Sequence, residues 1–218
     1  MNHKPMLRSL QVGAVRMNGS RHATDPLDRP WRSAFYKLPV SAPTWLGKTT
    51  LAGDEQESED HGGPDKAVLG YAASHYPLWR AEPGLSDMPH GGFGENFTID
   101  GLTENSVCIG DVYRIGDAIV QVTQPRQPCT NIARRWHMKY LPKRVQQTGR
   151  TGWYHRVIEE GMVEVGIAVD LLERPSPEWT VARASIVMVN RARRRAEAEE
   201  LADLPSLSAS WRETLAST

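Results

Sequence analysis

Apolar residues in the first two thirds of the chain recur in short runs that glycine and proline interrupt. Residues 92–99 carry Phe93, Glu95, Phe97 and Ile99 at alternate positions, a pattern typical of a half-buried strand. Runs at 107–109, 112–115 and 118–123 are separated by Gly-Asp turn dipeptides and predict a meander. Further strands are expected over 7–17, 34–40, 66–71, 153–158 and 163–172, and short helices over 72–81, 130–139 and 142–148. This spacing of strands predicts a mainly β, barrel-like domain with a few short helices.

The pattern changes near Arg174-Pro175-Ser176-Pro177. Residues 179–200 are rich in Ala, Arg and Glu and predict a helix, which Asp203-Leu204-Pro205 breaks. Leu207, Trp211 and Leu215 then recur at i, i+4 and i+8, on one face of a second helix. We therefore expect a β domain over 1–174 and a small helical segment over 175–218. Its arginines predict a solvated helix face, with a membrane or nucleic-acid contact as the alternative: Arg191, Arg193, Arg194 and Arg195.

The composition narrows the class of protein. With 218 residues, 39% hydrophobic and 24% charged, the chain matches a soluble globular protein and is too apolar to be a disordered one. No stretch approaches the ~20 consecutive apolar residues of a membrane span. The first six residues lack the apolar region of a secretory signal, and two cysteines do not form a disulfide framework. A cytoplasmic, reducing setting is expected.

The net charge is zero, from 26 basic and 26 acidic residues, but the charges are unevenly placed. Residues 118–158 contain no Asp or Glu and eight basic residues: Arg126, Arg134, Arg135, Lys139, Lys143, Arg144, Arg150 and Arg156. Such a segment is either a solvated face or a pocket for an anion. The neutral overall balance argues against nucleic acid as the partner.

The segment Gln124-Pro125-Arg126-Gln127-Pro128-Cys129 follows a predicted strand and precedes a predicted helix. Its two prolines fix the backbone and prevent pairing as a central strand. Cys129 is therefore expected near a helix N-terminus, which stabilises a thiolate, with three arginines close in sequence. The alternative is a buried structural cysteine. Cys108 lies in an apolar strand and is expected to pack in the core.

Two glycine-rich segments are the other candidates for chemistry. In His61-Gly62-Gly63-Pro64-Asp65-Lys66, glycines let the backbone approach a ligand and the lysine can hold an anion, unless the segment is only a turn. Gly91-Gly92-Phe93-Gly94-Glu95-Asn96 places tight backbone around polar groups, or is a glycine-bulged strand. The seven histidines show no zinc-binding spacing.

Taken together, these motifs resemble the MOSC domain, named after the C-terminal domain of molybdenum cofactor sulfurase. The resemblance spans residues 45–172 and also includes Gly53-Asp54 and Gly110-Asp111. The tail segment 204–212 is similar to the three-helix segment of YiiM-like members of that family. The resemblance implies a barrel-like fold, a molybdenum–pterin cofactor and the reduction of N-hydroxylated compounds such as hydroxylaminopurine bases. The alternatives are a sulfur or cofactor carrier with a Cys129 persulfide, and a non-catalytic anion-binding module.

The resemblance implies a role for Cys129, and the positions of the motifs predict roles for further residues. Cys129 is expected as the molybdenum ligand, with Glu95 or His61 as proton donor. The residues expected to bind the cofactor are Lys66, Asn96, Arg126, Gly62, Gly63 and Trp153. Tyr154 and Phe93 are, like Trp153, rings that stack on a purine or simply pack in the core. The chain has no dinucleotide-binding motif and no cysteine set for an iron–sulfur cluster, so we expect a separate electron-donor protein. The helical tail is then a docking surface for that protein or a homodimer contact.

Overall fold

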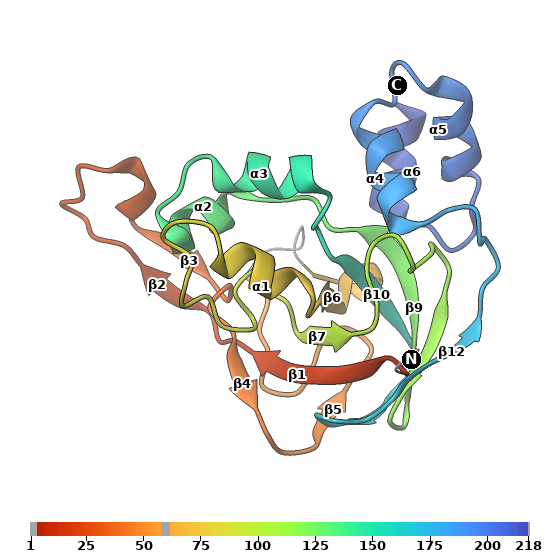
Figure 1. The fold of residues 1–218 in the computed structure, drawn as a ribbon, viewed down its shortest axis with the longest axis horizontal. Coiled ribbons are helices and arrows are strands. Elements are labelled where there is room, and N and C mark those ends of the chain that lie inside the picture. Colours follow the sequence, from red (N-terminus) through yellow and green to blue (C-terminus); the bar gives the residue numbers. More distant parts are fainter. Residues whose placement is uncertain (1–3, 58–61, 218) are drawn as a thin grey trace.

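The computed structural model describes residues 4–57 and 62–217 and is built on one large mixed sheet (Figure 1). The sheet has eight strands in the order β12-β8-β9-β10-β6-β7-β1-β4. Along the chain these are β1 (Met6–Val12), β4 (Leu38–Val40), β6 (Val68–Ala72), β7 (Phe97–Asp100), β8 (Val112–Ile115), β9 (Ala118–Pro125), β10 (Trp153–Glu159) and β12 (Val169–Glu173). Two small antiparallel pairs lie beside it, β2 (Arg16–Asn18) with β3 (Trp31–Ser33) and β5 (Thr44–Leu46) with β11 (Gly161–Val163).

The prediction of a mainly β domain with a few short helices and a helical C-terminal segment is confirmed. The sheet is not closed into a barrel, however: among the described residues its ladder runs from β12 to β4 without pairing these two edges. An isolated bridge between Met6 and Ala168 and a 2.9 Å hydrogen bond from Leu7 N to Ile167 O bring β1 toward the start of β12. This contact is an isolated bridge and does not form a ladder between two strands, so the sheet stays open.

The predicted meander is reduced to the antiparallel hairpin of β8 and β9, and β9 pairs on its other side with β10, which comes later in the chain. Residues 107–109 do not belong to it, and Cys108 makes only an isolated bridge with Thr180. The cause is the Asp111 side chain, whose Oδ2 accepts a hydrogen bond from Cys108 N at 2.9 Å and so turns the chain before β8. The predicted packing role of Cys108 agrees with its buried position.

Four predicted strands are shorter than expected. The strand predicted over 7–17 ends with β1 at Val12, and of the strand predicted over 34–40 only β4 forms. In the predicted strand 92–99 only β7, from Phe97, is extended, because Gly91 and Gly94 have positive φ and the backbone turns around the Glu95 carboxylate. The predicted strand 163–172 is two strands, β11 and β12, with a turn between them in which Gly166 has φ of +91°. Alternation of apolar residues did not distinguish a strand from turns that bury alternate side chains.

Three short helices gather on one side of the sheet, α1 (His75–Arg80), α2 (Thr130–Trp136) and α3 (Leu141–Thr148), as Figure 1 shows. They enclose a second apolar cluster that includes Tyr76, Trp79, Phe93, Ile132 and Leu141. Two of these helices, α2 and α3, belong to the connection between β9 and β10, which begins with the loop that carries Cys129.

The tail forms three helices, α4 (Val181–Val189), α5 (Arg195–Ala202) and α6 (Ala209–Ala216). The single helix predicted over 179–200 is divided, because Asn190 ends α4 by donating from Nδ2 to Ile186 O at 2.8 Å. The predicted apolar face of α6 is confirmed, since Leu207, Trp211 and Leu215 are buried.

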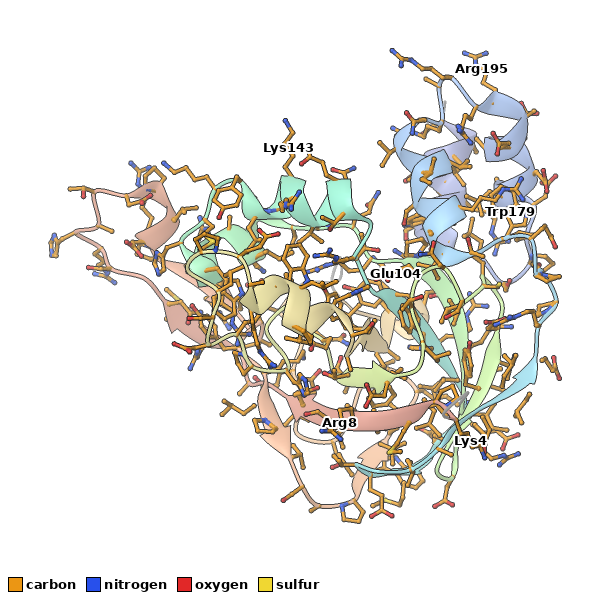
Figure 2. The ribbon with its side chains drawn as sticks, in the orientation of Figure 1. Lys4, Arg8, Glu104, Lys143, Trp179 and Arg195 are labelled. Atoms are coloured by element: carbon orange, nitrogen blue, oxygen red, sulfur yellow. The ribbon has the colours of Figure 1, made fainter. Side chains whose placement is uncertain are left out.

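The tail shares one hydrophobic core with the sheet, in which Trp179 and Val187 join Val120 and Val122. Figure 2 shows Trp179 at the side of the tail that faces the sheet and Arg195 at the far end. None of the helices in the described ranges is both long enough and apolar enough to cross a bilayer.

Candidate functional site

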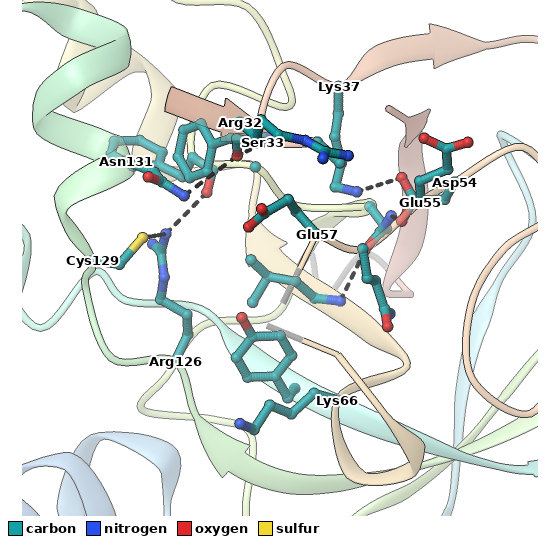
Figure 3. Close-up of a pocket in the computed structure, with 18 residues that line it drawn as sticks. Arg32, Ser33, Lys37, Asp54, Glu55, Glu57, Lys66, Arg126, Cys129 and Asn131 are labelled. Carbon is teal, nitrogen blue, oxygen red and sulfur yellow. Dashed lines mark hydrogen bonds and ion pairs between the residues drawn. The ribbon is translucent and has the colours of Figure 1, made fainter. Parts of the chain in front are cut away.

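A cavity of about 260 Å³ opens beside Cys129, between the loop that follows β9 and the segments 32–37 and 54–57 (Figure 3). Four of the predicted site residues line it: Lys66, Asn96, Arg126 and Cys129. Segments far apart in the sequence therefore meet at the predicted cysteine.

Cys129 is the N-cap residue of α2, with extended φ and ψ of −110° and 169°. This confirms the predicted position at a helix N-terminus directly after the proline-rich loop. Its sulfur lies 3.9 Å from Nη2 of Arg126, and the residue is partly exposed. The thiol therefore faces both a cation and the cavity.

Arg126 is only 3% exposed. Its Nη2 donates to Phe93 O at 3.2 Å, whereas Nη1 has no hydrogen-bond partner among the described residues. A buried guanidinium without a full set of acceptors is costly, and such a group calls for an acceptor from a ligand. The local geometry thus favours an anionic group next to Cys129.

The glycine-rich segment contributes Lys66, the last residue of the short helix η3 (Pro64–Lys66), to the wall of the cavity. Gly62 and Gly63 are not among the lining residues. Gly63 N donates to Gln56 Oε1 at 3.2 Å, and a Cβ on Gly62 would collide with the Gln56 side chain, which does line the cavity. Gly62 thus makes room for Gln56, whereas Gly63 allows the backbone its φ of +89°. His61 lies outside the described residues.

Asn96 joins three segments at the cavity wall. Its Oδ1 accepts from Leu69 N at 3.2 Å, and its Nδ2 donates to Gln11 O at 3.2 Å and to Asp54 Oδ2 at 2.9 Å. Because these bonds use its amide, Asn96 positions the wall and has little left to offer a ligand.

Asp54 also forms a buried ion pair with Lys37, and both side chains line the cavity. Burial lowers the pKa of Lys37, while the charge of Asp54 opposes that shift. Sequence reasoning missed Lys37, together with Arg32, Phe35 and Asn131. Arg32, Phe35 and Lys37 lie in or beside an irregular segment that contains no recognisable motif. Asn131 lies two residues after Cys129 and could have been predicted from that position.

The structure does not bring Glu95 or Trp153 to this cavity. Glu95 is fully buried and accepts from Tyr76 Oη, from Gly91 N at 2.7 Å, from Phe93 N at 3.1 Å and from Thr98 Oγ1 at 3.0 Å. Burial raises its pKa, and these hydrogen bonds oppose the rise. Trp153 is fully buried in the core and donates from Nε1 to His155 Nε2 at 3.1 Å.

Tyr154 and Phe93 are the aromatic candidates that do line the cavity. Burial raises the pKa of the Tyr154 phenol, and the nearby Arg126 charge opposes that shift. The phenol therefore stays protonated at neutral pH and presents an O–H donor close to Cys129.

No three His, Cys, Asp or Glu side chains converge into a metal-binding group within 4–57 and 62–217. A metal at Cys129 would therefore take most of its ligands from a bound organic group. A thiolate beside an arginine donor fits a soft metal that arrives on an anionic carrier.

Comparison with known proteins extends these observations. A model of the MOSC domain matches residues 57–170, and a model of the YiiM-like, 3-alpha helix domain matches 179–217. The chain is 44% identical to the Bacillus subtilis protein YflK over 182 residues, which cover 83% of this chain and 81% of YflK. A Gibberella moniliformis protein named reductase is 40% identical over 72% of this chain, which spans only 28% of that protein. The crystal structure of YiiM from Geobacillus stearothermophilus superposes with a TM-score of 0.81 at 35% identity, over 98% of both chains.

Proposed function

This chain belongs to the MOSC domain family, with a YiiM-like 3-alpha helix domain at its C-terminal end, and on that premise we propose that it is a molybdenum-cofactor-dependent reductase of N-hydroxylated compounds. The family association with the molybdenum cofactor and the name of the fungal relative support an oxidoreductase of this kind. Hydroxylaminopurine-type bases are the proposed substrates.

The observation that carries the proposal is the buried guanidinium of Arg126, which lies beside the Cys129 sulfur and has an unpartnered Nη1. The molybdenum cofactor is a pterin dithiolene that bears a phosphate. Arg126 and Lys66 would hold its anionic groups, and the Cys129 thiolate would bind the metal. When bound, the cofactor supplies the two-electron chemistry that removes oxygen from the N-hydroxyl group.

The overall reaction consumes R–NHOH, two electrons and two protons and releases R–NH₂ and water. A proton donor must therefore face the departing oxygen. We assign this role to Tyr154 Oη in place of Glu95, because Tyr154 lines the cavity whereas the Glu95 carboxylate is enclosed by four donors. Protons reach the phenol from water, which enters through the open side of the cavity.

The electrons come, in this proposal, from a separate electron-donor protein, since the sequence carries no dinucleotide-binding motif. The helical tail remains a candidate docking surface for that protein or a candidate homodimer contact.

The test is molybdenum per chain together with turnover. The protein is made in a host that synthesises the cofactor and is purified without oxygen, with Cys129→Ala in parallel. We expect near-stoichiometric metal in the wild type, a clear loss in the variant, and many turnovers of 6-N-hydroxylaminopurine with an artificial electron donor. Bound molybdenum without repeated turnover would contradict the reductase.

Bound molybdenum without turnover would favour the carrier function, which one independent observation also supports. Cys129 is partly exposed, as a persulfide that must transfer its sulfur to a partner would have to be. Retention of one labile sulfur per chain, lost in Cys129→Ala, would support it. Absence of both metal and pterin would leave the anion-binding module.

A further inference from the structure

A second cavity, of about 350 Å³, adjoins the first and shares Lys66, Cys129 and Tyr154 with it. Its remaining wall combines the loop after β9 with one face of α6, the last helix of the tail. We infer that this second cavity binds the substrate as a planar nitrogen heterocycle and that α6 is part of the substrate site. This inference rests on the proposed function, which puts the cofactor in the first cavity.

The position of α6 relative to Cys129 is fixed by hydrogen bonds to β9, just before the cysteine loop, and to the segment that ends at Lys66. Ser208 N donates to Thr123 O at 3.2 Å, at the end of β9, and Ala209 N donates to Asp65 Oδ2 at 3.0 Å. Ser208 Oγ caps the helix by accepting from Trp211 N at 3.3 Å. The tail helix is therefore held against the cysteine loop and forms a defined wall.

The indole N–H of Trp211 gives the clearest indication of what the second cavity binds. The residue is 3% exposed, and its indole Nε1 has no hydrogen-bond partner among the described residues. Other buried indoles are satisfied: Trp179 Nε1 donates to Glu200 Oε1 at 3.0 Å and Trp79 Nε1 to Tyr71 Oη at 2.6 Å. A buried donor left open beside a cavity indicates a ligand that brings an acceptor.

Two glutamines in the lining of the second cavity indicate which further hydrogen-bonding groups the ligand carries. Gln124 and Gln127 place two carboxamides at the cavity, each with a donor and an acceptor. Among the described residues the Gln124 side chain makes only long hydrogen bonds of 3.4 Å, to Pro125 O and from Ser210 Oγ, so its amide can exchange them for a ligand. Carboxamides pair with the adjacent donor and acceptor on the edge of a purine. A purine-type base therefore matches this lining.

The two cavities would therefore bind different chemical groups. Arg126, whose Nη1 has no partner among the described residues, lines the first cavity and suits an anion, whereas Trp211, whose indole N–H likewise has none, lines the second and suits a neutral acceptor. Cys129 and Tyr154 lie on both, so a base in the second cavity would be adjacent to a metal bound at the cysteine. Trp211 would then set specificity for the base without taking part in the chemistry.

The test measures adenine binding to the purified full-length, cofactor-loaded protein by calorimetry. Trp211→Phe keeps an aromatic ring and removes the N–H, and we expect it to weaken adenine binding about five- to tenfold. Ser210→Trp, which fills the cavity from the exposed side of α6, should abolish binding. Trp179→Phe is the matched control, because it removes a buried tail indole N–H that lines neither cavity, and should leave the affinity unchanged.

Molybdenum per chain is measured in every variant and should stay at the wild-type level, which separates loss of substrate from loss of cofactor. Adenine affinity that is equal in wild type, Trp211→Phe and Ser210→Trp, or absent in the wild type, would overturn the inference even if the protein reduces hydroxylamines. Conversely, a selective loss in Trp211→Phe without any turnover by the wild type would refute the reductase and keep the base-binding site.

Discussion

Nη2 of Arg126 lies 3.9 Å from Sγ of Cys129 at the start of α2. The two residues are separated by Gln127 and Pro128, so the rigid loop after β9 places both at one cavity. One guanidinium nitrogen lies beside the sulfur and donates to Phe93 O, and the other has no partner among the described residues. This pair links the sequence motif to the chemistry, and it yields the first prediction.

Arg126→Met should decrease molybdenum content strongly without destabilising the cofactor-free protein. The variant removes a buried cation with an unsatisfied donor and keeps most of the apolar stem. The free energy of unfolding of the apo form should therefore stay equal or rise, by up to about 1–3 kcal/mol. Urea unfolding and metal analysis check the two effects, with Lys143→Met, an exposed change on α3, as control. Equal molybdenum in both variants would remove Arg126 from the cofactor site.

Glu95→Gln should act on stability and leave catalysis per folded molecule intact. The substitution would place an amide N–H₂ against donors that now point at a carboxylate, since Tyr76, Gly91, Phe93 and Thr98 all donate to it. We expect a loss of about 2–4 kcal/mol in the free energy of unfolding. If the variant instead unfolded with the free energy of the wild type and showed a shifted pH profile of kcat, Glu95 would again be the candidate proton donor.

His155 should make the protein less stable in mild acid. Burial lowers its pKa to about 4, below its ordinary value of about 6.5 in an unfolded chain. Between these values the unfolded state binds more protons, so stability falls as pH decreases from about 6.5 and levels off below about 4. The contribution from pH 7 to pH 5 is about 2 kcal/mol. Urea unfolding of wild type and His155→Gln at both pH values should differ by this amount; identical pH dependence would contradict it.

Asp111→Asn should loosen the junction between the β domain and the tail. Asp111 is fully buried and accepts from both Nε and Nη2 of Arg174, at 2.8 and 2.7 Å, as well as from Cys108 N and Tyr113 Oη. Arg174 is exposed, so the loss comes from the buried side of the pair: the amide would turn an N–H₂ toward groups that now donate to a carboxylate, and we expect a loss of about 1–3 kcal/mol.

The matched control is Lys4→Ala, which breaks the exposed pair between Lys4 and Asp170 and should cost less than about 1 kcal/mol. Thermal unfolding compares the two variants. Equal shifts in Tm would show that the Arg174 pair does not anchor the tail.

Much of the site was accessible from the sequence because its signals are local. Pro125 still pairs with Trp153 as the last residue of β9, contrary to the expectation that both prolines prevent pairing, but the strand ends there and α2 begins directly after Cys129, so its N-cap position could be predicted. The i, i+4 and i+8 spacing of Leu207, Trp211 and Leu215 is also a local pattern, and it predicted correctly which face of the last helix is buried. Glu95, by contrast, looked catalytic in the sequence, because a carboxylate between glycines does not reveal how many backbone N–H groups turn toward it.

The sequence by itself determined the mainly β class, the helical tail, the cysteine loop and the basic character of the segment around it, all of which follow from backbone preferences and periodicity within a few residues. Only the tertiary structure decided that Lys37 and Asp54 face the cavity of Cys129, that Asn96 joins Leu69, Gln11 and Asp54, and that α6 lies against the cysteine loop. These contacts depend on which strands become neighbours, such as the parallel pair β6 and β7, and on a core that the tail shares with the sheet. Strand order and shared burial are properties of the whole chain, and no short stretch of residues encodes them.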